Sequence, residues 1–187
     1  EMCIRDSRLH SANSYGSSTP AADNDGVVVT SADPDKLVLM ALDTNGEEVW
    51  VRDLGPYDAI NGAGTSPVIV DDLVVLTNIQ MDANVMVRAG VLPKEFADDE
   101  PNESSIIAVD RKTGETRWTA PRKTFLAGYA TPCVRQLPNG DRELVFIDSA
   151  FGLTGIDPQT GQVNWQTEKL LPSRTVASPV IAGDLIF

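Results

Sequence analysis

One short segment, running from an Asp through a Gly to a Trp, occurs three times in this sequence. Its copies are Ala41–Trp50, Ala108–Trp118 and Gly155–Trp165, and in each copy the Trp lies four residues after the Gly. The first copy has one residue fewer between its Asp and its Gly. An internal repeat constrains a fold more strongly than any single motif, so these copies decide which architectures are open to the chain.

A second marker, a Ser or Thr followed by Pro, precedes each copy of the segment and occurs once more near the C-terminus. The steps between successive marker prolines are 47, 65 and 47 residues, the prolines being Pro20, Pro67, Pro132 and Pro179. Removing an insertion of about twenty residues from the middle step restores a single period. Two independent markers in the same order and phase therefore indicate a structural repeat.

Short apolar runs rich in β-branched residues lie between these markers, and each is bounded by Gly, Pro, Asn or Asp. This pattern predicts strands, and no long segment has the apolar period of a helix. About four strands per repeat, at a period of ~40–50 residues, is typical of a propeller blade. The fold predicted is all-β, a β-propeller fragment of about three and a half four-stranded antiparallel blades. The runs are Val27–Thr30, Leu37–Leu42, Val68–Val70, Leu73–Thr77, Ile106–Val109, Leu144–Ile147 and Val180–Ile181.

The residue types of the repeat have structural reasons. The Asp can accept hydrogen bonds from backbone N–H groups within a tight turn, and the Gly supplies a positive φ. The Trp falls on the outer strand, where it can fill the gap between blades and donate its N–H to a neighbouring carbonyl. The marker Pro can open the first strand of a blade, where no ladder donor is needed.

These residues resemble the repeat of the pyrroloquinoline-quinone-like propellers, whose "tryptophan docking" pattern is roughly Ala-x-Asp-x-x-Thr-Gly-x-x-x-Trp. Ala108–Trp118 fits it best, Ala41–Trp50 has the shorter turn, and Gly155–Trp165 has Gly for Ala. The sequence of these repeats looks most like that of the BamB-like group, whose members have roughly seven or eight blades. We expect residues 1–14 to be irregular or artefactual, and residues 15–187 to form the partial propeller. Its blade repeats would be 17–64, 65–129 with an insertion at 78–104, 130–176 and a truncated 177–187.

Composition and charge exclude some classes of function. The net charge of −12 argues against nucleic acid as a partner, since phosphate binding needs clustered Lys and Arg. No apolar run approaches the ~20 residues of a transmembrane helix. The two cysteines, Cys3 and Cys133, form neither a disulfide framework nor a metal-type pair.

The candidate site residues each have a structural interpretation that we favour. The three Trp could form a ligand platform, but packing between blades explains them better. The lone His10 lies in a polar stretch and cannot complete a catalytic or metal-binding set. Three Asp clusters could suggest calcium, but none has the spacing of a dedicated loop. We therefore assign no catalytic, cofactor-binding or metal-binding residue and no cofactor; the Asp clusters are Asp23–Asp25, Asp33–Asp35 and Asp71–Asp72.

The insertion, residues 78–104, combines apolar residues with an acidic run at Asp98–Glu103. Inserted loops of this length in a compact domain are usually functional or disordered. The insertion could contact a partner, or it could be a decoration without one. Its apolar residues are Met81, Val85, Met86, Val87, Val91, Leu92 and Phe96.

Three functions remain open at this point. The resemblance favours a non-catalytic scaffold of the periplasm or cell envelope, which binds proteins through a propeller face or the insertion. The lack of any residue that we can assign to catalysis favours the same function. The alternative is part of a quinoprotein dehydrogenase whose active site lies in further blades. A sensor domain attached to another module is the third.

Overall fold

The computed structural model describes residues 17–32, 36–57, 59, 62–90, 93–97, 103–122, 124, 126–168 and 175–187. Its strands form three four-stranded antiparallel sheets and one hairpin, each made of consecutive strands. Sheet 1 contains β1 (Ala21–Asp23), β2 (Gly26–Ala32), β3 (Leu37–Leu42) and β4 (Glu48–Asp53). Sheet 2 contains β5 (Val68–Val70), β6 (Leu73–Asn78), β7 (Ser104–Asp110) and β8 (Thr116–Arg122). Sheet 3 contains β9 (Cys133–Gln136), β10 (Arg142–Asp148), β11 (Gly152–Ile156) and β12 (Val163–Gln166), and the hairpin contains β13 (Ile181–Ala182) and β14 (Leu185–Ile186).

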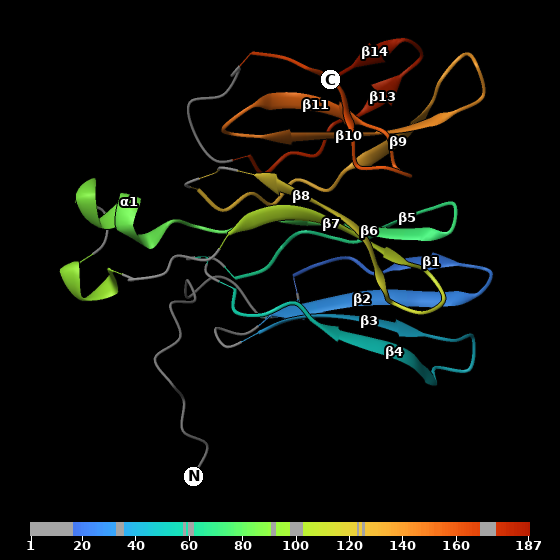
Figure 1. Cartoon of the computed structure of the whole chain (residues 1–187), viewed down its shortest axis with the longest axis horizontal. Helices are drawn as coiled ribbons and strands as arrows, with labels where there is room; N and C mark the ends of the chain where they lie inside the picture. The colour runs from blue at the N-terminus through green and yellow to red at the C-terminus, as the bar shows by residue number, and fades with distance from the viewer. Residues whose placement is uncertain are drawn as a thin grey trace.

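The three sheets are stacked face to face, and the hairpin lies beyond the third (Figure 1). The all-β prediction and the four-stranded repeat are therefore confirmed. Each sheet has the same irregularity, a register shift in the pairing of its last two strands, at Ala41/Leu42, Ala108/Val109 and Gly155/Ile156. A bulge recurring at one position of the repeat shows that the three sheets follow one structural plan.

Alternation along the central strands produces two apolar layers. In β6, Val74 and Leu76 belong to the core cluster shared with sheet 1, whereas Leu73 and Val75 belong to the cluster shared with sheet 3. Successive side chains of a strand point to opposite faces, so one strand can supply both layers. This is why every residue of β6 is buried.

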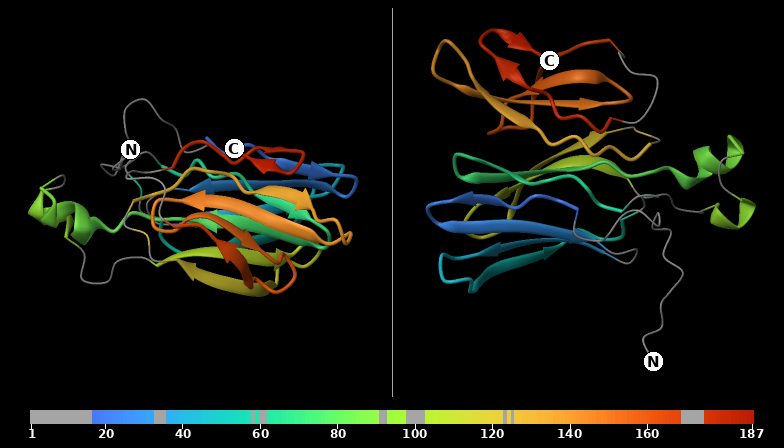
Figure 2. Two further views of the ribbon diagram at one scale, coloured as in Figure 1. Left: turned by 90° about the horizontal axis from the view of Figure 1, so that it is seen from above. Right: turned by 180° about the vertical axis from the view of Figure 1, so that it is seen from behind.

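The two ends of the sheets differ. At one end, the turn end, lie the hairpin turns β1–β2, β5–β6 and β9–β10 and the turns that carry the repeat's Asp and Gly. At the other end, the loop end, lie the longer connections between sheets, and Figure 2 shows α1 projecting there. The marker prolines Pro20, Pro67 and Pro132 each directly precede the first strand of a sheet, as expected.

The insertion between β6 and β7 contains two short helices, α1 (Ala83–Arg88) and the 3-10 helix η1 (Lys94–Phe96). The sequence analysis predicted no helix, because a helix of six residues is too short to show a period. Asp82 caps α1, and its carboxylate accepts a hydrogen bond from the Val85 N–H at 3.0 Å. No helix among the described residues is long and apolar enough to cross a membrane.

Candidate functional site

The repeat's tryptophans link each of the first two sheets to the sheet that follows. The Trp50 indole N–H donates to the Arg111 carbonyl at 3.0 Å, and the Trp118 indole N–H donates to the Pro158 carbonyl at 2.8 Å. Both acceptors lie in the Asp–Gly turn of the next sheet. The packing expected of these two side chains is therefore present.

A glycine lies beneath each of these two rings. A Cβ built on Gly114 would lie 2.7 Å from the Trp50 ring, and one built on Gly161 would lie 2.6 Å from the Trp118 ring. Both glycines also have a positive φ, of 71° and 73°. The turn thus needs Gly twice over, for its backbone conformation and for the close approach of the indole.

The Asp of each turn accepts backbone hydrogen bonds, as predicted. Asp43 accepts from Asn45 and Glu47, and Asp110 accepts from Lys112 and Thr113. These N–H groups hold the pKa of both carboxyls below the ordinary value, the largest contributions coming from Glu47 and Thr113. These carboxylates therefore stabilise the turns.

The marker Ser and Thr residues form a hydrogen-bonded series that the sequence analysis missed. The Thr19 N–H donates to the Ser66 hydroxyl at 2.8 Å, the Ser66 N–H to the Thr131 hydroxyl at 3.3 Å, and the Thr131 N–H to the Ser178 hydroxyl at 2.9 Å. Each bond joins one repeat to the next. The hydroxyl group explains why Ser or Thr, and not only Pro, recurs in the marker.

Three Arg–Asp pairs also join sheets, and none was predicted; one is the exposed pair Asp71–Arg142, between sheets 2 and 3. At the turn end, Arg111 of sheet 2 binds both carboxylate oxygens of Asp23 in sheet 1, at 3.0 and 2.8 Å. The Arg111 hydrogen bond holds the pKa of Asp23 below its ordinary value. At the loop end, Arg122 of sheet 2 binds Asp148 of sheet 3 at 2.7 Å, and both side chains are buried. Charged residues far apart in sequence give no periodic signal, so pattern analysis could not pair them.

The predicted site candidates fall into two groups. Asp23 binds Arg111, Asp71 binds Arg142 at 2.9 Å, and Asp72 binds Arg117 at 3.1 Å. Within the described ranges, no group of three His, Cys, Asp or Glu side chains could hold a metal ion. Cys133 is half-buried, and burial raises the pKa of its thiol. Cys3, His10, Asp33–Asp35, Val91, Leu92 and residues 98–102 lie outside the described residues.

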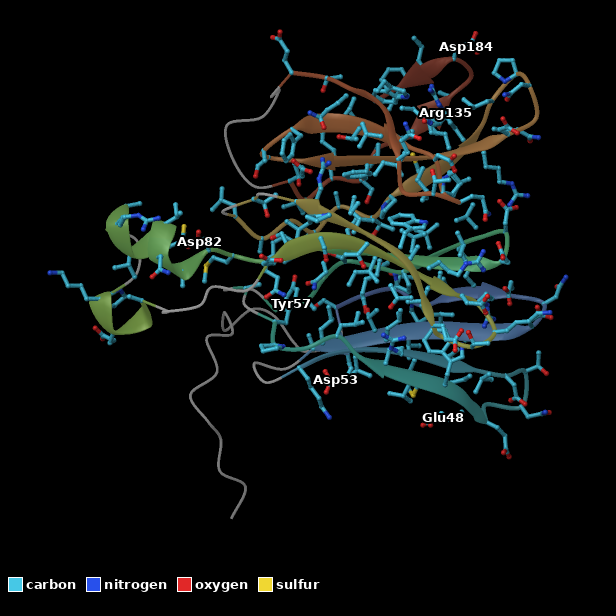
Figure 3. The ribbon with its side chains drawn as sticks, viewed as in Figure 1. Glu48, Asp53, Tyr57, Asp82, Arg135 and Asp184 are labelled. Carbon is cyan, nitrogen blue, oxygen red and sulfur yellow. The ribbon has the colours of Figure 1, made fainter. Side chains whose placement is uncertain are left out.

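The base of the insertion is built into the loop end. The Ser104 hydroxyl accepts from the Gln80 N–H at 2.9 Å and donates to the Gln80 carbonyl, so it joins the two ends of the insertion. The Gln80 side chain donates to the Pro56 carbonyl at 3.1 Å, which ties the insertion to the segment that follows sheet 1. Tyr57, labelled with Asp82 in Figure 3, donates to the Ile79 carbonyl.

Apolar side chains anchor the same segment. Met81, Ala83 and Met86 are 3%, 1% and 7% exposed and belong to the core cluster between sheets 1 and 2. Beyond this anchor, the helices project past the sheets, as Figures 1 and 2 show from opposite sides. The outward residues Arg88, Lys94 and Glu95 are exposed. The insertion is thus an anchored projection that offers polar side chains to solvent.

A concave surface lies at the turn end, between sheets 2 and 3. It is a polar, open groove of about 680 Å³, and Asp71, Arg142, Asp157 and Asn164 are among its lining residues. The β9–β10 hairpin forms one wall, because its loop, residues 137–141, is longer than the turns β1–β2 and β5–β6. Arg142 bridges to Asp71 across the groove, so much of its charge is already paired.

Stacked four-stranded sheets with indoles between them define the class of protein, a β-propeller of repeated blades. A family model described as "Outer membrane protein assembly factor BamB" (PQQ_2) matches residues 7–187, and the chain belongs to this family. No curated protein matches the sequence.

Solved structures share the fold. BamB from Moraxella catarrhalis is 20% identical with a TM-score of 0.56, and the match covers 89% of this chain and 40% of that one. A europium-containing methanol dehydrogenase is 14% identical with a TM-score of 0.56, covering 80% of this chain and 31% of that one. The quinohemoprotein alcohol dehydrogenase of Comamonas testosteroni is 14% identical with a TM-score of 0.52, covering 80% and 28%. The chain thus spans less than half the length of these structures.

Proposed function

We propose that this chain is part of a non-catalytic β-propeller scaffold of the bacterial cell envelope, which binds a protein partner through the insertion. The observation that carries the proposal is the construction of the insertion, with a base held by buried hydrogen bonds and a projecting, exposed tip. This anchor holds the exposed side chains of the tip in a fixed position, which favours the binding of a partner. Membership of a family described as an outer-membrane protein assembly factor supports a partner from that machinery in the periplasm.

The polar side chains of the tip provide the test of binding. A photo-crosslinking amino acid is placed in the full-length protein at Arg88 or Lys94, and at Asn45 or Lys112 as matched exposed positions at the turn end. We expect one defined outer-membrane assembly protein to crosslink from 88 and 94 but not from 45 and 112. Equal crosslinking from both pairs, or none from the insertion, contradicts this role.

A pair of variants separates binding from folding. The triple variant Arg88→Ala, Lys94→Ala and Glu95→Ala should weaken binding without changing the melting temperature, because all three side chains are exposed. Ser104→Ala should lower the melting temperature, because it opens the base of the insertion and leaves the buried Gln80 N–H without its acceptor.

The competing proposal is a quinoprotein dehydrogenase, supported by the shared fold of the two dehydrogenases. Titration of the purified full-length protein with pyrroloquinoline quinone and calcium distinguishes the two. Stoichiometric binding with substrate-dependent reduction of the quinone would replace the scaffold proposal.

A further inference from the structure

The turn end of the molecule carries most of its negative charge. The six turns of sheets 1–3 at this end, with the residues that flank them, contain ten acidic and three basic side chains, a net charge of −7 out of the −12 of the whole chain. A face with such an excess of carboxylates attracts cationic segments of other proteins and repels anionic ones. The turns are residues 23–26, 43–47, 70–73, 110–115, 136–142 and 157–162.

The groove between sheets 2 and 3 lies in this face, at a position where the repeat changes. Between sheets 1 and 2, the buried Arg111 side chain reaches across and binds Asp23. Arg111 directly follows the turn Asp of sheet 2, and the corresponding residue of sheet 3 is Pro158, which lines the groove. Pro158 offers no cation to sheet 2. An open groove therefore lies where the neighbouring pair of sheets has an internal guanidinium.

Two carboxylates of the groove, Asp141 and Asp157, are not paired with a cation. Both accept hydrogen bonds from neutral groups of their own turns, at 2.7 and 2.8 Å. Arg142, which also lines the groove, binds Asp71 at 2.9 Å, and neither Asp141 nor Asp157 has a salt bridge among the described residues. An incoming cation would therefore not need to displace an internal one.

Apolar surface lies beside these carboxylates. Leu137 and Pro158 line the same groove, the first half-buried and the second buried. Arg and Lys side chains pack their alkyl stems on such surface while the charged end binds oxygen atoms. Within the described ranges, no three acidic side chains converge as a metal site requires. The groove thus matches a long basic side chain better than a metal ion.

We propose that this groove is a docking site for a basic segment of a partner protein. An Arg or Lys side chain of that segment binds Asp141 and Asp157, and its stem packs on Leu137 and Pro158. The negative charge of the surrounding turns steers the segment toward the groove. The site lies at the opposite end of the sheets from the insertion, so it does not depend on the role proposed for the insertion.

Fluorescence anisotropy of a labelled peptide of alternating Arg and Gly tests the proposal on the full-length protein. We expect the peptide to bind, and the double variant Asp141→Asn with Asp157→Asn to weaken its affinity by roughly tenfold. The matched double variant Glu47→Gln with Glu115→Gln removes the same charge from exposed positions of the same face, and should weaken the affinity by at most about twofold.

A peptide with citrulline in place of Arg keeps the shape and loses the charge, so it should not bind. Binding of the citrulline peptide as tight as that of the Arg peptide overturns the proposal. Absence of binding by the Arg peptide, or an equal loss of affinity in the two double variants, also overturns it.

A second pair of variants decides the question even where the change at Asp157 disturbs its turn. Pro158→Arg gives sheet 3 the residue that sheet 2 has at this position, and it keeps the backbone carbonyl that accepts from Trp118. The new guanidinium supplies the groove with an internal cation, so peptide affinity should fall by roughly tenfold. Thr160→Arg adds the same charge at an exposed position of the same turn, outside the lining of the groove, and should lower the affinity by about twofold. Equal effects of these two variants would mean that the peptide responds to the charge of the face alone, and would overturn the proposal.

Discussion

Two interfaces join the three sheets: the first seam lies between sheets 1 and 2, and the second seam lies between sheets 2 and 3. The two seams share two kinds of link and differ in a third, the charged pairs. Both have an indole over a glycine and a hydroxyl bond between markers. The first seam has Asp23–Arg111 at the turn end, whereas the second has the exposed pair Asp71–Arg142 at the turn end and the buried pair Arg122–Asp148 at the loop end. The shared links come from the repeat, whereas each charged pair belongs to one seam.

The Asp23–Arg111 pair and the Arg122–Asp148 pair each have uncharged residues at the corresponding positions of the other seam. Counted from the Trp, Leu54 corresponds to Arg122, and by strand register Asn78 corresponds to Asp148. Correspondingly, Val70 and Pro158 occupy the positions of Asp23 and Arg111. If two blades packed in the wrong order, a buried charged side chain would face an uncharged one, so these pairs can specify which blades are neighbours.

Removing the acid from the buried pair should have the largest effect. Asp148→Ala leaves the Arg122 guanidinium uncompensated between the rings of Phe146 and Phe151, at a cost of about 3–5 kcal/mol. The double variant Arg122→Leu with Asp148→Asn transplants the residues of the other seam and should recover most of that loss. Thermal denaturation of the full-length protein measures both, and a double variant no more stable than Asp148→Ala would show that the seams are not interchangeable.

Removal of the indole that links sheets 2 and 3 should have the next largest effect. Trp118→Ala should destabilise the protein by about 3 kcal/mol, because the indole fills the space between two sheets and bonds the Pro158 carbonyl. Gly161→Ala, which forces a Cβ into the same ring, serves as a matched variant that keeps the Trp. A melting curve of Trp118→Ala that matches the wild type would mean that the indole is dispensable for the stack.

The turn-end pair should respond to acid. Asp23 has a pKa lowered by Arg111, so the pair stabilises the fold above the ordinary carboxyl pKa, and this contribution is lost as the pH falls through the lowered value. Arg111→Ala should cost about 2 kcal/mol near neutral pH and progressively less in acid. Asp23→Asn should flatten the same acid dependence; identical acid profiles for wild type and Arg111→Ala would rule out this contribution.

The shared links could be predicted from the sequence and the seam-specific ones could not. The Asp–Gly–Trp spacing predicted the turns, the outer strand and the indole contacts, because the same local sequence pattern occurs three times in the chain. Arg111 and Asp23 are separated by 88 residues, and only the stacking of sheets brings them together. Gly155 was visible as a departure from the repeat, but no periodic pattern reveals that the Trp165 indole occupies the space where a Cβ would lie. Short α1 likewise escaped prediction, because tertiary contacts of Met81 and Met86 stabilise it rather than its own period.

The smallest effect should come from Arg52, a residue that strengthens only the first seam. Its Nη1 donates to the Gly114 carbonyl at 2.7 Å and its Nη2 to the Thr116 hydroxyl at 3.2 Å. Arg52 lies two residues after Trp50, and the corresponding residue of the second seam, two residues after Trp118, is Ala120. The variant Arg52→Ala therefore gives the first seam the residue that the second seam has at this position. We expect a loss of about 0.5–1 kcal/mol, the net value of a partly solvated hydrogen bond. A loss as large as that of Arg111→Ala would mean that Arg52 contributes as much to the first seam as the Asp23–Arg111 pair does.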